Sequence, residues 1–167
     1  MGQRLEQFAA ECRRLLKAEP GAAGRSRVCA LLCTWLRDDA FVREVVHDAT
    51  SERALAYEDA ELGFCIFGHR YEGARKDVAP HDHGPSWAIY GQARGATKMT
   101  DYALLEPAAP GRPGKVRETR RYAIAPGEAH LYNEGDLHAP LREGPTRLVR
   151  IEGTNMDRIE RLKYQVA

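Results

Sequence analysis

The hydrophobic periodicity of the chain changes near residue 50, and this change constrains the fold more than any other feature. Before it, apolar residues recur at spacings of three and four, which is typical of amphipathic helices. Asp38 can cap one such helix, and Pro20-Gly21 ends another. The pattern predicts helices over 3–17, 25–37 and 39–48. Residues 1–48 are therefore expected to form a helical N-terminal segment.

From about residue 54, short apolar or alternating segments typical of β-strands replace the helical stripe. Glycines and prolines separate them at near-regular spacing, which predicts a sandwich or barrel. The predicted strands cover 54–57, 63–71, 87–91, 97–105, 116–124, 130–132 and 148–152. We expect a single domain over 1–167, with a β-barrel over 54–153 and a C-terminal tail able to form a short helix over 156–165.

The near-neutral charge argues against nucleic acid as the main partner. The chain has 25 basic and 24 acidic residues, whereas nucleic-acid binding usually depends on a surplus of Lys and Arg. The sequence contains no run of 18 or more apolar residues, so it predicts no membrane span. The first twenty residues also lack the apolar core of a signal peptide. Four cysteines without paired spacing indicate reduced thiols. We expect a cytoplasmic protein that binds neither nucleic acid nor membranes.

The most informative polar motif is the pair of histidines His81 and His83, separated by Asp82. In a strand, residues i and i+2 point to the same face, so both imidazoles would project into one space, about 7 Å apart along the backbone. Imidazole suits iron, copper, nickel or zinc better than magnesium or calcium. The pair predicts two ligands of one metal ion, although an HxH pair by itself is equally consistent with a surface role.

The residues around this pair make the chain resemble the cupin superfamily. The first cupin motif is G(X)5HXH(X)3-4E(X)6G, and HDHGPSWAIYGQARG supplies His81, His83 and then Gly95 at the required distance. Ala88 stands at the position of the acidic metal ligand. The resemblance therefore implies a site that lacks its fourth protein ligand.

A second cupin motif, G(X)5PXG(X)2H(X)3N, follows in order. The stretch GEAHLYNEGDLH supplies Gly127, then Asn133 in place of proline, then Gly135 and His138. Arg142 stands at the position of the final asparagine. The two motifs together place the resemblance within about residues 54–153.

The resemblance implies an all-β core, the cupin double-stranded β-helix or jelly-roll barrel, preceded by about three α-helices. It also makes His138 the third metal ligand. Its rival His130 suits a hydrogen-bonded strand histidine at the barrel rim better than a ligand. His47 is expected at a helix end and His69 in a strand, each solvated or hydrogen-bonded.

Among cupins, three histidines without a carboxylate resemble the thiol dioxygenases, namely cysteine dioxygenase and 3-mercaptopropionate dioxygenase-like metal-dependent proteins. The resemblance implies Fe2+ as cofactor, with Zn2+, Ni2+ and Mn2+ as alternatives, and O2 and a small molecule as reactants. Ala88 also replaces the cysteine that forms a Cys-Tyr crosslink in mammalian-type cysteine dioxygenases. The Ser-x-His-x-Tyr pattern of a late strand is absent too, because residues 147–152 occupy that region.

Candidate substrate-binding residues flank the predicted ligands. The family's carboxylate-binding arginine, upstream of the HxH pair, corresponds to Arg53 or Arg70, and spacing does not choose between them. Trp87 suits the barrel core or the substrate pocket. Tyr90 is the better pocket candidate, because its phenol can donate a proton near the metal.

Arg150 and Glu152 share one face of a predicted strand, so both face the barrel interior or both face solvent. A charged pair inside a barrel is costly unless it is paired or used, so an inward orientation would make both of them pocket residues. Arg150 would then bind substrate, and Glu152 would join Tyr90 as an acid/base.

Three functions are compatible with these residues. The favoured one is a non-haem iron dioxygenase-like enzyme that acts on a small thiol or organic acid. The second is a non-oxidative metal cupin, an isomerase, lyase or hydrolase, in which zinc, nickel or manganese is a Lewis acid. The third is a non-enzymatic cupin that binds a small molecule. A homodimer is compatible with each of them.

Overall fold

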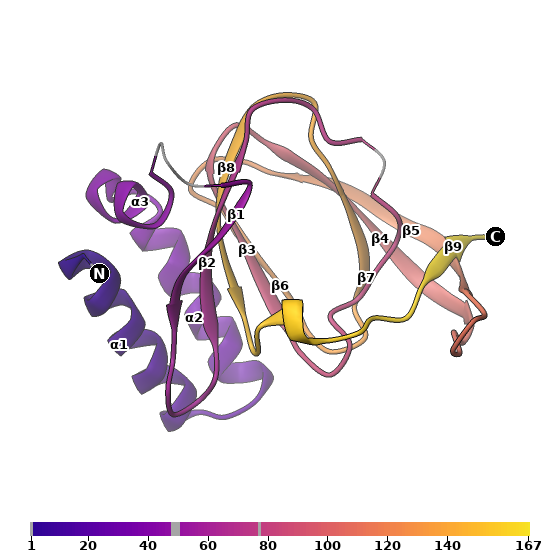
Figure 1. Ribbon diagram of the computed structural model, residues 1–167, viewed down its shortest axis with the longest axis horizontal. Coiled ribbons are helices and arrows are strands. Elements are labelled where there is room, and N and C mark those ends of the chain that lie inside the picture. The colour runs from indigo at the N-terminus through magenta and orange to yellow at the C-terminus, as the bar shows by residue number, and fades with distance from the viewer. Residues whose placement is uncertain (1, 48–50, 77) are drawn as a thin grey trace.

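The computed structural model describes residues 2–47, 51–76 and 78–167, and its helices precede its strands (Figure 1). The helices are α1 (Gln3–Ala18), α2 (Ala22–Trp35) and α3 (Asp39–Val45). Asp38 caps α3 as predicted, because its carboxylate accepts hydrogen bonds from the N–H groups of Ala40 and Phe41. Residue 48, the predicted end of the third helix, lies outside the described residues.

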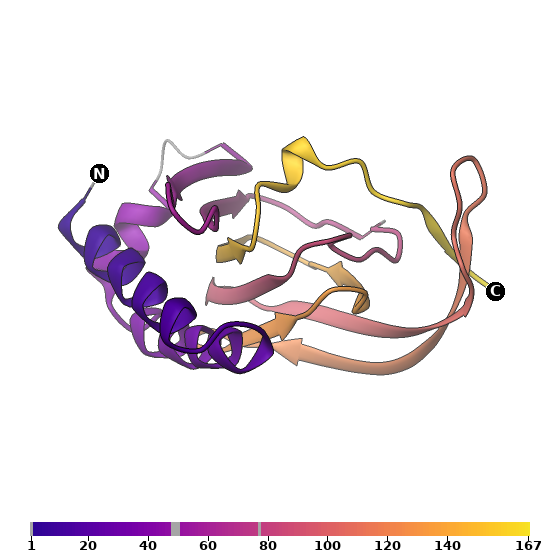
Figure 2. The same ribbon diagram turned by 90° about the horizontal axis from the view of Figure 1, so that it is seen from below.

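Aromatic side chains join the three helices. Phe8 of α1 packs against Trp35 of α2 and Phe41 of α3, with ring centroids 5.7 and 4.8 Å apart. The helices lie together on the outer side of one sheet, at the left of Figures 1 and 2. The other side of that sheet faces the barrel interior.

The described part of the chain forms nine strands in two sheets. They are β1 (Arg53–Glu58), β2 (Cys65–Tyr71), β3 (Ala88–Arg94), β4 (Thr97–Glu106), β5 (Gly114–Ile124), β6 (Ala129–Tyr132), β7 (Leu137–Leu141), β8 (Thr146–Glu152) and β9 (Tyr164–Val166). One sheet has the order β1-β2-β8-β3-β6 and the other β7-β4-β5-β9. Strands far apart in the chain, such as β2 and β8, are antiparallel neighbours. The predicted fold, a jelly-roll double-stranded β-helix behind three helices, is confirmed.

Side chains of the five-stranded sheet alternate between the helices and the barrel interior. Ile89 and Ile151 belong to the core that packs against the helices. Tyr90 and Leu148 belong to a second cluster inside the barrel. This alternation decides which polar residues of β2, β3 and β8 can reach an interior site.

The C-terminal tail differs from the prediction. The helix expected over 156–165 is wrong, because only Met156–Arg158 form a single 3-10 turn. The chain then runs extended to β9, which pairs in parallel with β5 (Figure 2). The edge of β5 offers unpaired backbone groups, and the N–H of Gly114 donates to the carbonyl of Lys163.

Two β segments also differ from the prediction. Leu137–Leu141 forms β7, which was not among the predicted strands. The segment from His81 to His83 is not a regular strand, and His81 makes only an isolated bridge to His138. Pro80 precedes this segment and Gly84-Pro85 follows it, and prolines have no N–H for a sheet ladder.

All four cysteines of the chain are free thiols, and Cys12 and Cys65 are buried. Burial raises the pKa of the Cys65 thiol to about 11, so the thiol is uncharged at neutral pH. Within the described ranges, no helix combines the length and the apolar character that crossing a membrane requires.

Candidate metal centre

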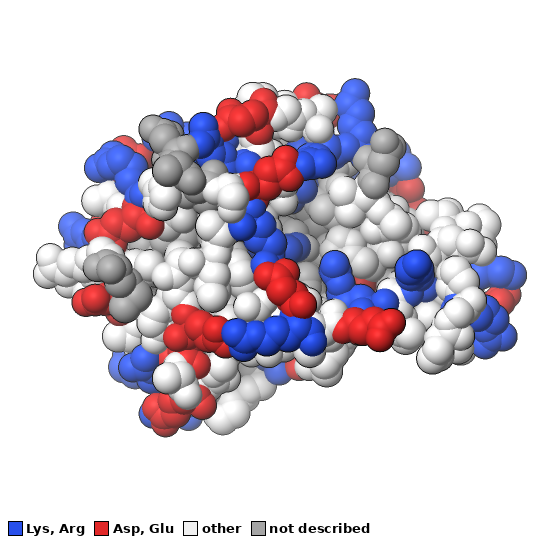
Figure 3. Space-filling model, viewed as in Figure 1, with Lys and Arg blue, Asp and Glu red and all other residues white. Residues whose placement is uncertain are grey.

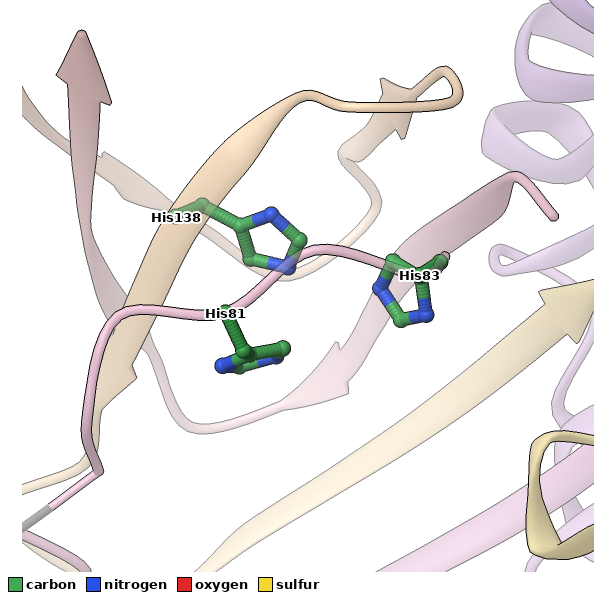
Figure 4. Close-up of side chains that lie close together, drawn as sticks. All are labelled: His81, His83 and His138. Carbon is green, nitrogen blue, oxygen red and sulfur yellow. The ribbon is translucent and has the colours of Figure 1, made fainter. Parts of the chain in front are cut away.

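Three histidines from two parts of the chain meet inside the barrel (Figure 4). His81 and His83 come from the segment before β3, and His138 comes from β7. One ring nitrogen from each lies within 4.8 Å of the other two. The structure thus brings together the three predicted ligands in a cluster that can bind a metal ion.

Backbone pairing explains why the third histidine lies beside the first. The N–H of His81 donates to the carbonyl of His138 at 3.0 Å, and the N–H of His138 donates back to His81 at 2.9 Å. Directly opposed residues of an antiparallel bridge bring their side chains together. Their ring centroids are 4.6 Å apart. Residues 57 positions apart in the sequence therefore form one site.

The cluster is held in the neutral state that metal binding requires. Burial, opposed in part by a hydrogen bond to the Ala79 carbonyl, lowers the pKa of His81 to about 4. Burial also holds the pKa values of His83 and His138 well below the usual range, with Arg150 contributing at His83 and His81 at His138. All three imidazoles are therefore unprotonated near pH 7 and offer lone pairs to a cation.

Hydrogen bonds orient two of the rings. Nδ1 of His81 lies 3.1 Å from the carbonyl oxygen of Ala79, and Nδ1 of His138 lies 2.9 Å from that of Asp136. A carbonyl only accepts, so each Nδ1 carries the proton and each Nε2 is free to bind a metal. His83 Nδ1 is buried and has no partner among the described residues. A donor set with free lone pairs and an orphaned buried nitrogen fits a bound metal ion.

Tyr90 adds a hydroxyl to this cluster. Its Oη lies 3.3 Å from Nε2 of His83 and 3.2 Å from Nε2 of His138. Its ring lies in the interior and is almost fully buried. The phenol therefore stands beside the nitrogens that would bind a metal, where it can donate a hydrogen bond to a further ligand.

Sequence reasoning missed Tyr132. Its ring stacks on the imidazole of His138 with centroids 3.8 Å apart, and its hydroxyl lies 2.5 Å from that of Tyr122. Strand alternation in β6 places His130 on the same side as Tyr132, and its ring lies 4.7 Å from that of Tyr132. His130 lies outside the three-histidine cluster. The alternating pattern of 129–132 could have indicated the inward side chain of Tyr132.

The structure separates the remaining candidates into two groups. Trp87 lies in the core against the helices, with the Arg25 guanidinium 5.6 Å from its ring. Arg70 neighbours Glu72 at 2.5 Å, on the side of β2 opposite to His69. Neither residue reaches the cluster. His47 is exposed after α3.

Arg53, Arg150 and Glu152 face the interior. The Arg53 guanidinium lies 2.9 Å from the Glu152 carboxylate, and Arg150 lies 3.3 Å from its other oxygen. The Arg150 guanidinium also lies 3.9 Å from the centre of the Tyr90 ring. The charged pair of β8 is thus turned inward and linked through Tyr90 to the histidines.

A cavity of about 770 Å3 opens beside the cluster. His81, Tyr71, Arg142 and Arg150 line it, together with Ile159 and the residues from Arg161 to Gln165 of the C-terminal segment. Basic and acidic side chains are intermingled on the face of the molecule shown in Figure 3. The cavity offers room for a small molecule next to the three histidines.

No protein-family model matches the sequence, and no curated protein matches it. Solved structures with similarity include a cupin-2 domain-containing protein from Shewanella frigidimarina, 13% identical, with a TM-score of 0.42 over 59% of this chain and 76% of that one. A cupin superfamily protein from Desulfitobacterium hafniense is 9% identical, with a TM-score of 0.42 over 59% and 72%. A recombinant oxalate oxidase in complex with glycolate is 14% identical, with a TM-score of 0.46 over 66% and 57%. The strand order of the chain itself identifies the jelly roll.

Proposed function

We propose that this chain is a cupin-type metalloenzyme, and specifically a non-haem iron dioxygenase that acts on a small thiol or organic acid. The observation that carries the proposal is the set of three neutral histidines with the Tyr90 hydroxyl beside two of them, at the wall of a basic cavity. Imidazole nitrogens suit divalent iron, and a site without a carboxylate ligand leaves the full charge of the ion.

His81, His83 and His138 would hold the metal. When bound, Fe2+ supplies open coordination positions and the electrons that dioxygen chemistry requires. The protein contributes neutral donors, a fixed orientation of two rings through the Ala79 and Asp136 carbonyls, and a buried setting. These features support metal binding without a fourth protein ligand.

Tyr90 is the residue that we propose as proton donor. Its hydroxyl lies within hydrogen-bond distance of two ring nitrogens, so a group bound between those rings would lie within reach of the same proton. The Arg150 guanidinium packs over the Tyr90 ring, 3.9 Å from its centre, and so helps to hold the phenol in this position. Glu152 is a positioning residue in this scheme, because Arg53 and Arg150 occupy its oxygens.

A non-oxidative metal cupin, using Zn2+, Ni2+ or Mn2+ as a Lewis acid, is the second candidate. The observation in its favour is the same set of three histidines. Because neutral ligands do not reduce the charge of a divalent ion, the ion stays strongly electrophilic. Tyr90 would then be the acid/base of an isomerase, lyase or hydrolase. The third candidate, a non-enzymatic cupin, requires only a ligand in the cavity.

Metal content and oxygen consumption distinguish these functions. Elemental analysis of the purified protein should find iron, and the iron-loaded protein should consume O2 with a small thiol or organic acid. Turnover that persists without O2, with zinc, nickel or manganese bound, would assign the non-oxidative function. Protein without metal and without turnover after loading with each ion would contradict both enzymatic candidates.

A further inference from the structure

The cavity beside the three histidines is lined by positive charge. Arg142, Arg150, Arg161 and Lys163 contribute to its wall, and among the described residues no aspartate or glutamate does so. The chain as a whole carries a formal net charge of only +1, so this concentration is local. A concave site with one sign of charge attracts ligands of the opposite sign.

Arg142 is the strongest indication of a missing anion. The residue is 5% exposed, and its Nε is buried without a hydrogen-bond partner among the described residues. No described carboxylate lies within 4 Å of its guanidinium, which instead lies 4.6 Å from the centre of the Tyr71 ring. A buried cation without a counter-ion is costly unless a ligand supplies one.

His69 leaves a second buried polar atom in the same region. It is 4% exposed, its Nδ1 lies 3.0 Å from the Tyr71 hydroxyl, and its Nε2 has no hydrogen-bond partner in the part of the chain that the structure describes. If the hydroxyl donates to Nδ1, Nε2 carries the proton and is a donor without an acceptor. Arg142 and His69 thus flank Tyr71, each with one nitrogen unsatisfied.

The other arginine of the inner wall is only partly neutralised. Arg150 shares the single carboxylate of Glu152 with Arg53. At the mouth, Arg161 and Lys163 are exposed, and no described carboxylate lies within 4 Å of either charge. The cavity therefore holds more positive charge than one carboxylate group can balance, even before a divalent cation occupies the histidines.

We propose that the cavity binds a small organic acid with at least two negative charges, carried by two carboxylates or by one phosphate group, and that Arg142 and Arg150 hold one carboxylate or the phosphate. In a dicarboxylate, the second carboxylate lies toward His81 or toward Arg161 and Lys163 at the mouth. Arginine binds carboxylate and phosphate oxygens through paired N–H donors, so dicarboxylates and phosphate monoesters share the required chemistry. The proposal names the substrate class of the metalloenzyme proposed above and rests on that function for the ligand's role as substrate.

Calorimetric titration of the full chain, as purified and again after chelation, tests the proposal. The probes are succinate, inorganic phosphate, the monoanion propionate and the neutral succinamide. Succinate or phosphate should bind at least about tenfold more tightly than propionate, because each further charge-assisted contact contributes about 1.5 kcal/mol or more. The tighter of the two assigns the anionic groups as carboxylates or as a phosphate ester. Equal affinity of monoanion and dianions would overturn the proposal.

Variants locate the site. Arg142→Gln should weaken binding of the preferred dianion at least about tenfold. The double variant Arg161→Gln/Lys163→Gln changes only exposed residues, so it keeps the test valid if Arg142→Gln does not fold. The matched control is Arg117→Gln, an exposed arginine of β5 outside the cavity. Unchanged affinity in the cavity variants would overturn the proposal. Anion binding is measured without metal as well. A failure of the anion proposal can therefore be distinguished from a failure of the protein to bind iron.

Discussion

The hydroxyl of Tyr90 lies 3.2 Å from Nε2 of His138, although the two residues belong to strands of opposite sheets. The phenol therefore joins the two walls of the barrel at the candidate metal centre. We predict that Tyr90→Phe retains the metal and the fold but lowers turnover by about 100-fold, the lower end of general acid–base contributions. Steady-state kinetics with matched metal content measures this effect. Unchanged turnover would show that the hydroxyl takes no part.

The three histidines should bind one metal ion as a set. Replacement of His81, His83 or His138 by alanine removes a third of the donors, so each variant should lose the metal after dialysis. Elemental analysis of the folded variants measures this loss. His130→Ala is the matched control, because His130 lies in the same barrel but outside the cluster. Retention of stoichiometric metal in His81→Ala would refute the assignment of the site.

Glu152 should be essential for stability. Its side chain is 1% exposed and is the shared counter-charge of Arg53 and Arg150. Glu152→Gln leaves two guanidinium groups without this charge, so the free energy of unfolding should fall by about 3 kcal/mol. Denaturant titration checks the value. Asp157→Asn removes the exposed partner of Arg53 and should cost less than about 1 kcal/mol. Equal effects of the two variants would contradict the buried role.

Acid should destabilise the metal-free protein. Burial lowers the pKa of His81 to about 4 and also holds the pKa of His69 well below its usual value, with Arg150, Arg53 and Arg142 contributing at His69. The unfolded chain binds protons below pH 6.5 and the folded chain does not, so stability is present above pH 6.5 and is lost as pH falls toward 4. Each histidine that stays neutral in the folded protein lowers the free energy of unfolding by up to about 2 kcal/mol at pH 5.

Urea unfolding at pH 7.5 and pH 5.0 measures this loss. The His69→Gln variant should show a smaller difference between the two pH values, because one neutral histidine has been removed. The exposed His47 provides the control, and His47→Gln should behave like the wild type. A midpoint that does not change with pH in the wild type would count against neutral buried histidines.

Glycine at position 68 should be required for the close packing of α3 against the sheet. A Cβ at this position of β2 would lie 2.1 Å from the carbonyl oxygen of Val45 at the end of α3. Gly68→Ala must displace backbone, and we expect a loss of about 1–3 kcal/mol. Gly73→Ala is the control, since its Cβ would meet no atom of the described residues within 4 Å. This variant should change the free energy of unfolding by less than about 0.5 kcal/mol. Thermal unfolding of both variants compares them.

The sequence by itself determined the class of structure. Helical periodicity over the first 48 residues and short strands after 54 predicted three helices before an all-β barrel, because side-chain spacing reflects local backbone geometry. The prediction was wrong where local pattern was weak. The tail forms β9 instead of a helix because the edge of β5 binds it, and β7 was not predicted.

The sequence also indicated the three histidines, through their spacing and the resemblance that it suggested. It left open which way Arg150 and Glu152 face, and a shift of one residue in strand register reverses that answer. Only the pairing of β8 between β2 and β3 turned both residues inward, toward Arg53 and Tyr90.

Tertiary structure alone placed Tyr132 against His138 and Arg142 beside His69 and Tyr71. The contacts of Tyr132 with His138 and of Arg142 with Tyr71 join segments far apart in the sequence, and their geometry depends on how the two sheets face each other. The spacing of residues along the sequence contains no information about how the two sheets pack together. The hydrophobic periodicity of the sequence therefore specified the helices and most of the strands. The packing of the two sheets decided which charged and polar side chains meet in the barrel interior.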